Sequence, residues 1–149
     1  MNNPSFMQQA LEQARLAAKR GEVPVGALIV RGGVVLAADG NRTLERNDPT
    51  AHAEMLVIRE AASKIGSQRL TDCDLYVTLE PCPMCAAAIS FARIRRLYFS
   101  VTDEKGGAVV SGPRLYGRAI CHHAPQVYDG ILEEEARDLL QTFFRKLRD

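Results

Sequence analysis

The stretches His52-Ala53-Glu54 and Pro81-Cys82-Pro83-Met84-Cys85 decide how the rest of the chain is arranged. One imidazole and two thiols at Cys-x-x-Cys spacing suit a zinc ion, whose catalytic form has three protein ligands and keeps a fourth position for water. Glu54 follows the histidine by two residues, too close to chelate comfortably beside it but near enough to exchange protons with that water. The pattern therefore predicts a catalytic zinc site with ligands His52, Cys82 and Cys85 and with Glu54 as the proton carrier.

The residues around both stretches predict that each one begins a helix. Asp48-Pro49-Thr50 offers two possible helix caps, which places the histidine and the glutamate in or near a first helical turn. With Pro83 as the first residue of a second helix, Cys82 becomes its cap and Cys85 lies one turn further on. Thiolates at a helix N-terminus are favoured by the unpaired N–H groups and by the helix dipole. We therefore expect two helix N-termini to face one metal ion.

The remaining hydrophobic pattern predicts a layered α/β domain. Apolar residues recur at helical spacing or form short β-rich runs, and Gly32-Gly33 suits a tight hairpin between two of these runs. The predicted helices are 6–20, a segment ending near 64, 84–92 and 131–148, and the predicted strands are 25–30, 34–38, 75–79, 96–101 and 126–128. Both strands of the hairpin are expected to be buried on both faces. This alternation of elements favours helices on both faces of a mixed sheet.

Length and composition are those of one compact domain over residues 1–149. With 46% hydrophobic and 25% charged residues, such a chain is expected to bury roughly 70% of its unfolded surface. The first five residues lack the charged and apolar regions of a leader, and no apolar run is long enough to cross a bilayer. We therefore expect a cytoplasmic protein with no membrane partner, whose four cysteines are thiols or ligands rather than disulfides.

The cysteine pair also has simpler interpretations. Cys82 and Cys85 alone could form a redox pair or half of a structural zinc site. The candidate fourth ligands of such a site are Cys73, Cys121, His122 and His123. Glu54 beside a ligand histidine favours the catalytic interpretation, because a structural ion has no use for a carboxylate at that place.

Three other features are open to a structural as well as a functional interpretation. Asn41 could be an ordinary turn residue. The loop 103–107 carries two glycines that would let a ligand approach the backbone, but it could also be a solvated turn. Because the net charge is only +1, nucleic-acid binding would depend on two clusters of basic residues, 93–96 and 145–148, which could equally be solvated surfaces.

Larger parts of the sequence resemble a known family. His-x-Glu followed by Pro-Cys-x-x-Cys is the known pattern of zinc nucleobase deaminases. Within the cytidine deaminase superfamily, the chain resembles the bacterial tRNA-specific adenosine deaminases nearly from end to end. The stretches that carry the resemblance are Glu22-Val23-Pro24-Val25-Gly26-Ala27, Gly40-Asn41-Arg42, Asn47-Asp48-Pro49-Thr50-Ala51-His52-Ala53-Glu54, Leu75-Tyr76-Val77-Thr78-Leu79-Glu80-Pro81-Cys82 and Phe143-Phe144-Arg145. The resemblance implies a three-layer α/β/α cytidine deaminase-like domain with a mixed sheet of about five strands.

The resemblance also implies an activity. It is the zinc-dependent hydrolytic deamination of adenosine to inosine at the wobble position of a tRNA anticodon, chiefly of tRNA-Arg, by a homodimer with one Zn²⁺ per subunit. In this reaction a zinc-activated water attacks carbon six of the purine. Glu54 takes a proton from the water and passes protons to the ring nitrogen and to the departing amine.

The resemblance further assigns contacts with the substrate. The assigned residues are Asn41 for the base, Val23 and Pro24 for the pocket wall, Asp103 and Lys105 for the anticodon backbone, and Phe143, Phe144 and Arg145 for a tRNA-binding C-terminal helix. From Ala108 to Tyr128 the chain departs from the family pattern, so no contact is carried over there.

Two other functions remain open on the sequence. A free nucleobase or nucleoside deaminase for guanine or cytosine would share the metal site, but it would have no use for the aromatic and basic C-terminal end. A zinc-stabilised RNA-binding module without catalysis would gain little from Glu54.

Overall fold

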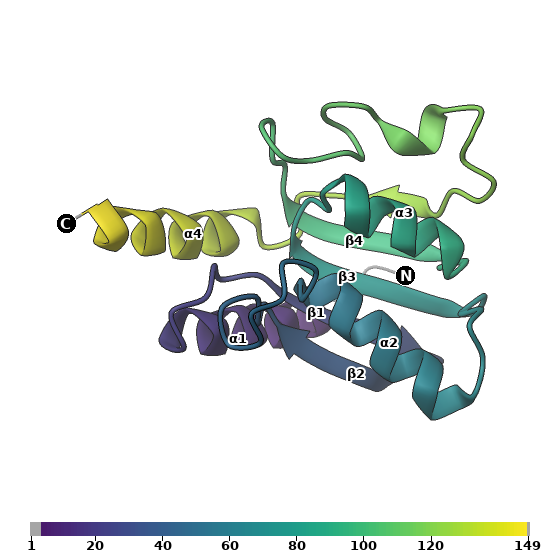
Figure 1. The fold of residues 1–149 in the computed structure, drawn as a ribbon, viewed down its shortest axis with the longest axis horizontal. Coiled ribbons are helices and arrows are strands. Elements are labelled where there is room, and N and C mark those ends of the chain that lie inside the picture. The colour runs from purple at the N-terminus through teal and green to yellow at the C-terminus, as the bar shows by residue number, and fades with distance from the viewer. Residues whose placement is uncertain (1–3, 149) are drawn as a thin grey trace.

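The computed structural model describes residues 4–148, which form a mixed sheet with helices on both of its faces (Figure 1). The helices are α1 (Pro4–Lys19), α2 (Ala53–Ile65), α3 (Pro83–Phe91) and α4 (Glu133–Arg148), with a short 3-10 helix η1 (Leu115–Gly117). The strands are β1 (Gly26–Arg31), β2 (Val34–Gly40), β3 (Cys73–Leu79), β4 (Arg96–Val101) and β5 (Gln126–Tyr128). They lie in the order β2-β1-β3-β4-β5.

The pairing of the strands brings distant segments to one end of the sheet. β1 is antiparallel to both β2 and β3, whereas β4 runs parallel to β3 and β5 runs parallel to β4. Because Ala27 pairs with Val77, the residues just before β1 lie beside Leu79, the last residue of β3. Helix α3 begins four residues later, at Pro83, so its N-terminus is close to the same end of the sheet.

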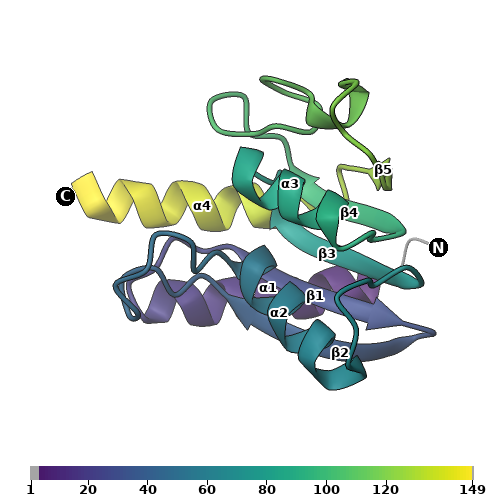
Figure 2. The same cartoon turned by 45° about the vertical axis from the view of Figure 1, so that its right-hand side comes forward.

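The helices form two layers around the sheet. Side chains of a strand alternate between its faces, and Leu28 of β1 packs in a cluster with Met7 of α1, whereas the adjacent Ile29 packs with Val57 of α2 and Ile89 of α3. Figures 1 and 2 show α2 and α3 on one face of the sheet and α1 on the other. The predicted α/β/α architecture with a mixed five-stranded sheet is confirmed.

One strand differs from its prediction. β2 is not buried on both faces, because it is the edge strand of the sheet and Val34 is 60% exposed. The predicted hairpin is confirmed: Gly32 and Gly33 both have positive φ (55° and 78°), which suits the tight turn between β1 and β2.

The C-terminal helix is buried only over its first half. Ala136 and Leu140 are buried, but Phe144 is 41% and Leu147 is 67% exposed. In Figure 1 the end of α4 extends well beyond the sheet. The apolar residues of α4 thus make a core contact at one end of the helix and an exposed surface at the other. Among residues 4–148, no helix has both the length and the apolarity to cross a membrane.

Candidate active site

Two of the predicted metal ligands occupy the position just before a helix. His52 precedes α2 and Cys82 precedes α3, both with extended backbone angles (φ −75°, ψ 151° and φ −71°, ψ 172°), and neither side chain makes a capping hydrogen bond. Such positions usually hold Ser, Thr, Asp or Asn, whose side chains cap the helix. The predicted caps in residues 48–50 are therefore wrong, because Asp48 instead accepts hydrogen bonds from the Thr50 amide and hydroxyl in its own turn (2.9 and 2.7 Å).

The three predicted ligands converge. His52 Nδ1 lies 3.7 Å from Cys82 Sγ and 3.5 Å from Cys85 Sγ, and the three ligand atoms all lie within 4.8 Å of one another. Tetrahedral zinc, with Zn–N bonds of about 2.0 Å and Zn–S bonds of about 2.3 Å, separates nitrogen from sulfur by about 3.5 Å. The donor set and its spacing therefore fit one zinc ion.

The three ligand side chains shift one another's pKa values. The hydrogen bonds that the Cys82 thiolate accepts from Cys85 and from His52 lower the pKa of Cys82 to about 4 against the opposing effect of burial. The hydrogen bond to Cys82 raises the pKa of His52 and, with burial, also raises the pKa of Cys85. Metal ligands must be deprotonated, so binding of a cation here would release the proton of the Cys85 thiol.

Glu54 lies in the first turn of α2 and is 4% exposed. Burial raises the pKa of this carboxyl group from 4.5 to about 7, although its hydrogen bond to its own backbone and the charge of His52 oppose the rise. A general acid or base works best when its pKa lies near the working pH. Glu54 can therefore both accept and donate a proton near neutral pH.

A small pocket opens over the metal ligands. Its volume is about 260 Å³, just below the range of roughly 300–1,000 Å³ typical of pockets for drug-sized molecules. The residues that line it are Val23, Val25, Asn41, Thr43, His52, Glu54, Leu79, Glu80, Cys82, Asp103 and Gly106. Of the predicted pocket wall, Val23 is thus in place, whereas Pro24 is buried and the next residue along, Val25, takes the second position. The size suits one planar base.

The side chain of Asn41 has one end fixed. Its Oδ1 accepts a hydrogen bond from the Ala53 amide at the start of α2, at 2.8 Å. A backbone N–H can only be met by the oxygen of the amide, so the NH₂ group remains as the donor for a ligand in the pocket. Asn41 thereby connects the end of β2 to the helix that carries His52 and Glu54.

A wider groove adjoins the pocket and leads toward α4. It has a volume of about 710 Å³, and Val23, Leu79 and Asp103 line both hollows. Its other lining residues are Val101, Thr102, Glu104, Lys105, Arg137, Leu140, Gln141 and Phe144. A smaller hollow next to Phe144 includes Arg145. Six of the contact residues assigned from the resemblance line these adjoining hollows between the pocket and the exposed end of α4, whereas Pro24 and Phe143 line none of them: the six are Val23, Asn41, Asp103, Lys105, Phe144 and Arg145.

Two of the assigned residues have structural contacts of their own. Asp103 Oδ1 accepts hydrogen bonds from the amides of Lys105 and Gly106 (3.2 and 3.0 Å), so this oxygen stabilises its own turn, and the exposed side chains of Glu104 and Lys105 both line the groove. Phe143 packs edge-on against Phe144, with ring centroids 5.4 Å apart.

The alternative fourth ligands lie elsewhere. Among the described residues, His52, Cys82 and Cys85 form the one group able to hold a metal ion. Cys73 is buried at the start of β3, and His123 Nε2 is 2.7 Å from the carbonyl oxygen of Ile94. A closed four-ligand site therefore finds no support.

The first basic cluster is partly used within the fold. Arg95 and Arg96 form ion pairs with Asp74 at 3.1 and 3.7 Å. The cluster at the end of α4 is exposed, so it is the better candidate for binding an anionic partner.

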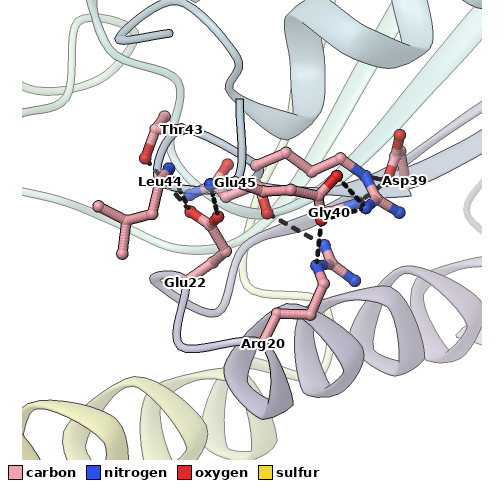
Figure 3. A network of polar contacts seen from close by, with 9 residues as sticks. Arg20, Glu22, Asp39, Gly40, Thr43, Leu44 and Glu45 are labelled. Atoms are coloured by element: carbon pink, nitrogen blue, oxygen red, sulfur yellow. Dashed lines mark hydrogen bonds and ion pairs between the residues drawn. The ribbon is translucent and has the colours of Figure 1, made fainter. Parts of the chain in front are cut away.

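Two buried carboxylates lie at the rim of the site, and the sequence predicted no role for either. The first, Glu22, is 1% exposed and accepts hydrogen bonds from the amides of Leu44 and Glu45 (3.1 and 2.9 Å) and from the Thr43 hydroxyl (3.3 Å). Figure 3 shows Glu22 reaching from the turn after α1 into this loop. Burial alone would raise the pKa of Glu22, but these hydrogen bonds lower it below its ordinary value. Glu22 thus fixes the loop that carries the pocket residue Thr43.

The second, Glu80, is 2% exposed and stands between β3 and Cys82. It accepts a hydrogen bond from the Asp103 amide, 23 residues later. The sequence suggested that the glycines of the loop 103–107 let a ligand approach the backbone. At Gly107 the group that approaches the backbone is instead the Glu80 carboxylate, because a Cβ atom there would lie 2.4 Å from Glu80 Cδ. The available signal in the sequence was a carboxylate directly before the Pro-Cys-x-x-Cys motif, at the end of a buried strand.

Comparison with known proteins decides the family. The family model of MafB19-like deaminases matches residues 1–148. The tRNA-specific adenosine deaminase of Agrobacterium fabrum is 59% identical over 143 residues, which cover 96% of this chain and 94% of that protein. The chain belongs to the tRNA-specific adenosine deaminase family.

Solved structures agree with membership of the tRNA-specific adenosine deaminase family. A structure from a study of A-to-I editing by tRNA deaminases at the wobble position of transfer RNA matches with a TM-score of 0.92 and 58% identity, covering 93% of this chain and all (100%) of that one. A guanine deaminase from Nitrosomonas europaea matches with a TM-score of 0.83 over 95% of this chain and 84% of its own, but at 23% identity this shows a common fold alone. Since the fold is shared, the substrate must be argued from the site.

Proposed function

We propose that the chain acts as one zinc-dependent deaminase domain that converts adenosine to inosine at the wobble position of a tRNA anticodon. The observation that carries this proposal is the convergence of His52, Cys82 and Cys85 beside the buried Glu54, at the bottom of a pocket that continues into a groove. The pocket is the size of one base, and the groove leads to exposed aromatic and basic side chains. This arrangement suits a base presented by a longer nucleic acid.

His52, Cys82 and Cys85 would hold one Zn²⁺ per subunit. When bound, zinc supplies a water of lowered pKa as the nucleophile. Glu54 would accept a proton from the attacking water and deliver protons to the purine ring nitrogen and to the leaving amine. One carbon–nitrogen bond is replaced by a carbon–oxygen bond, and ammonia is released. The pKa of Glu54, about 7, suits a group that must alternate between acid and base.

The adenine base would be held between two walls of the pocket. Val23 and Val25 offer apolar surface, and the NH₂ group of Asn41 offers a donor to a ring nitrogen. A base can enter so small a pocket only when it is unstacked, as in a single-stranded loop. The anticodon loop of a tRNA presents its wobble base in this way.

The rest of the RNA would lie along the groove and α4. Lys105 borders the groove, and Arg145 lies next to the exposed ring of Phe144. Basic side chains contact phosphates and set the register, while aromatic rings stack on unpaired bases. We infer tRNA-Arg as the main substrate from the resemblance of the sequence, and we place the activity in the cytoplasm, where tRNA is found.

We further infer a homodimer. Phe91 at the end of α3 and Ile120 after η1 are 78% and 77% exposed, and both border an apolar hollow of about 270 Å³ that Ala87 and Leu115 also line. Large exposed apolar groups gathered at one place mark interaction sites. A second copy of the chain is the occupant that the family resemblance supports.

The substrate is tested by offering the purified zinc-loaded protein two classes of compound. One is an anticodon stem-loop RNA with adenosine at the wobble position; the other is a set of free guanine, cytosine and cytidine. We expect inosine in the RNA and no measurable turnover of the free compounds. Turnover of a free base with an unchanged RNA would replace this proposal by a small-molecule deaminase.

A further inference from the structure

Glu80 is a buried charge whose partners all come from one loop. Its side chain is 2% exposed, between the end of β3 and the ligand Cys82. Placing a carboxylate out of water is unfavourable unless hydrogen bonds replace the water. Five donors do so, and every one belongs to residues 103–111.

The two carboxylate oxygens hold different parts of this loop. Oε1 accepts hydrogen bonds from the Asp103 amide and the Ser111 hydroxyl, both at 2.9 Å. Oε2 accepts hydrogen bonds from the amides of Val109, Val110 and Ser111, at 3.0, 2.9 and 3.0 Å. Glu80 thus holds both ends of the loop 103–111 beside the Pro81-Cys82 turn.

The loop 103–111 forms part of the wall of both the base-sized pocket and the adjoining groove. Asp103 and Gly106 line the base-sized pocket, and residues 102–105 line the adjoining groove. The Asp103 carboxylate accepts hydrogen bonds from the amides of Lys105 and Gly106, so the placement of Asp103 determines where Lys105 stands. The Asp103 amide is itself held by Glu80 Oε1.

Gly107 allows this contact. A Cβ atom at this position would lie 2.4 Å from Glu80 Cδ, 2.5 Å from its Oε1 and 2.6 Å from the Asp103 carbonyl oxygen. Any side chain here would therefore push the carboxylate and the loop apart.

We propose that Glu80 is a positioning residue for the RNA substrate: its carboxylate fixes the loop 103–111 against the turn that carries Cys82, and so sets the distance between the groove wall and the metal ligands. This inference rests on the proposed function. Glu80 touches no reacting atom in this account, and it acts through Asp103 and the turn that presents Lys105.

Glu80→Gln tests the proposal with a nearly isosteric side chain. The amide oxygen can serve the three amides that now face Oε2, and the Ser111 hydroxyl can reverse to accept from the new NH₂ group. The Asp103 amide then faces another donor and loses its partner. We expect KM for an anticodon stem-loop RNA to rise about tenfold, the equivalent of about 1.4 kcal/mol, while kcat falls less than threefold and zinc content is unchanged.

The charge change of this variant works against the expected effect. Net charge rises from +1 to +2, which by itself favours RNA binding. Glu12→Gln is the matched control, because Glu12 is 59% exposed on α1 and pairs only with the neighbouring Arg15 among the described residues. It should leave KM unchanged or slightly lower. Gly107→Ala should reproduce the rise in KM from the opposite side of the contact.

Hydrogen exchange separates positioning from a general loss of structure, and it does not depend on activity. Glu80→Gln should speed amide exchange in the peptide containing Asp103 while peptides of α2 and β1 keep their protection. A lower kcat at unchanged KM, with faster exchange throughout, would show a merely structural role and overturn the proposal. If the wild-type protein leaves the RNA unchanged, the proposed function fails; unchanged exchange at Asp103 in Glu80→Gln would instead refute the loop contact itself.

Discussion

Replacing Glu54 by glutamine should remove turnover and, at alkaline pH, stabilise the metal-free protein. The carboxyl group is 4% exposed, and burial raises its pKa from 4.5 to about 7. Each pKa unit corresponds to about 1.4 kcal/mol, so ionising this group in the folded protein costs roughly 3 kcal/mol more than in the unfolded chain. Glutamine has nearly the same shape and no charge, so it removes this cost.

The sign of the pH dependence follows from the direction of the shift. Since the folded pKa lies above the unfolded one, the contribution of Glu54 to stability is fully present below pH 4.5 and is lost as the pH rises through about 7. The difference in unfolding free energy between Glu54→Gln and wild type should therefore grow in favour of the variant by roughly 3 kcal/mol between pH 4.5 and pH 8.

The assay is urea unfolding of chelator-treated wild type and Glu54→Gln at several pH values, alongside RNA deamination by the zinc-loaded proteins. The two ligand cysteines and His52 titrate in both proteins, so the difference reports the Glu54 carboxyl group together with its charge coupling to His52. Activity should fall by roughly two to four decades, as expected for loss of a positioned acid and base. A stability difference that does not change with pH would refute the burial argument, and inosine formation within tenfold of wild type would refute the catalytic role.

Three further outcomes are expected. Cys85→Ala should lose zinc by metal analysis because one of three ligands is removed, whereas Cys73→Ala, changed at a buried thiol outside the site, should keep it; full zinc retention by the first variant would contradict the ligand assignment. Arg145→Glu should weaken RNA binding and flatten its salt dependence, since each lost phosphate contact reduces the slope by about one; an unchanged slope would remove α4 from the RNA surface. In sedimentation the protein should have about twice the 16.4 kDa chain mass and Phe91→Glu should be a monomer, so a dimeric variant would place the interface elsewhere.

The parts of the site that follow from local sequence were predictable. Pro83 determines the start of α3, and this alone places Cys82 before the helix and Cys85 one turn into it. The start of α2 was harder to predict from the sequence. Asp48 resembles a helix cap in the sequence, but its carboxylate bonds Thr50 in a separate turn, and the helix begins only after His52.

Contacts between distant segments were not predictable in the same way. The partners of Glu80 lie 23 to 31 residues further along, in a segment without periodic apolar residues. The exposure of β2 depends on its place at the edge of the sheet, which follows from β1 pairing with both β2 and β3. Short apolar runs show that a strand exists, but they do not give its neighbours.

The most direct test of the account is mass spectrometry of an anticodon stem-loop RNA, with adenosine at the wobble position, after incubation with the zinc-loaded protein. We expect the RNA to gain one dalton at that nucleotide alone, because an amine is replaced by an oxygen, and we expect no change with Glu54→Gln. An RNA of unchanged mass under conditions in which the protein retains one zinc ion per chain would contradict the central claim.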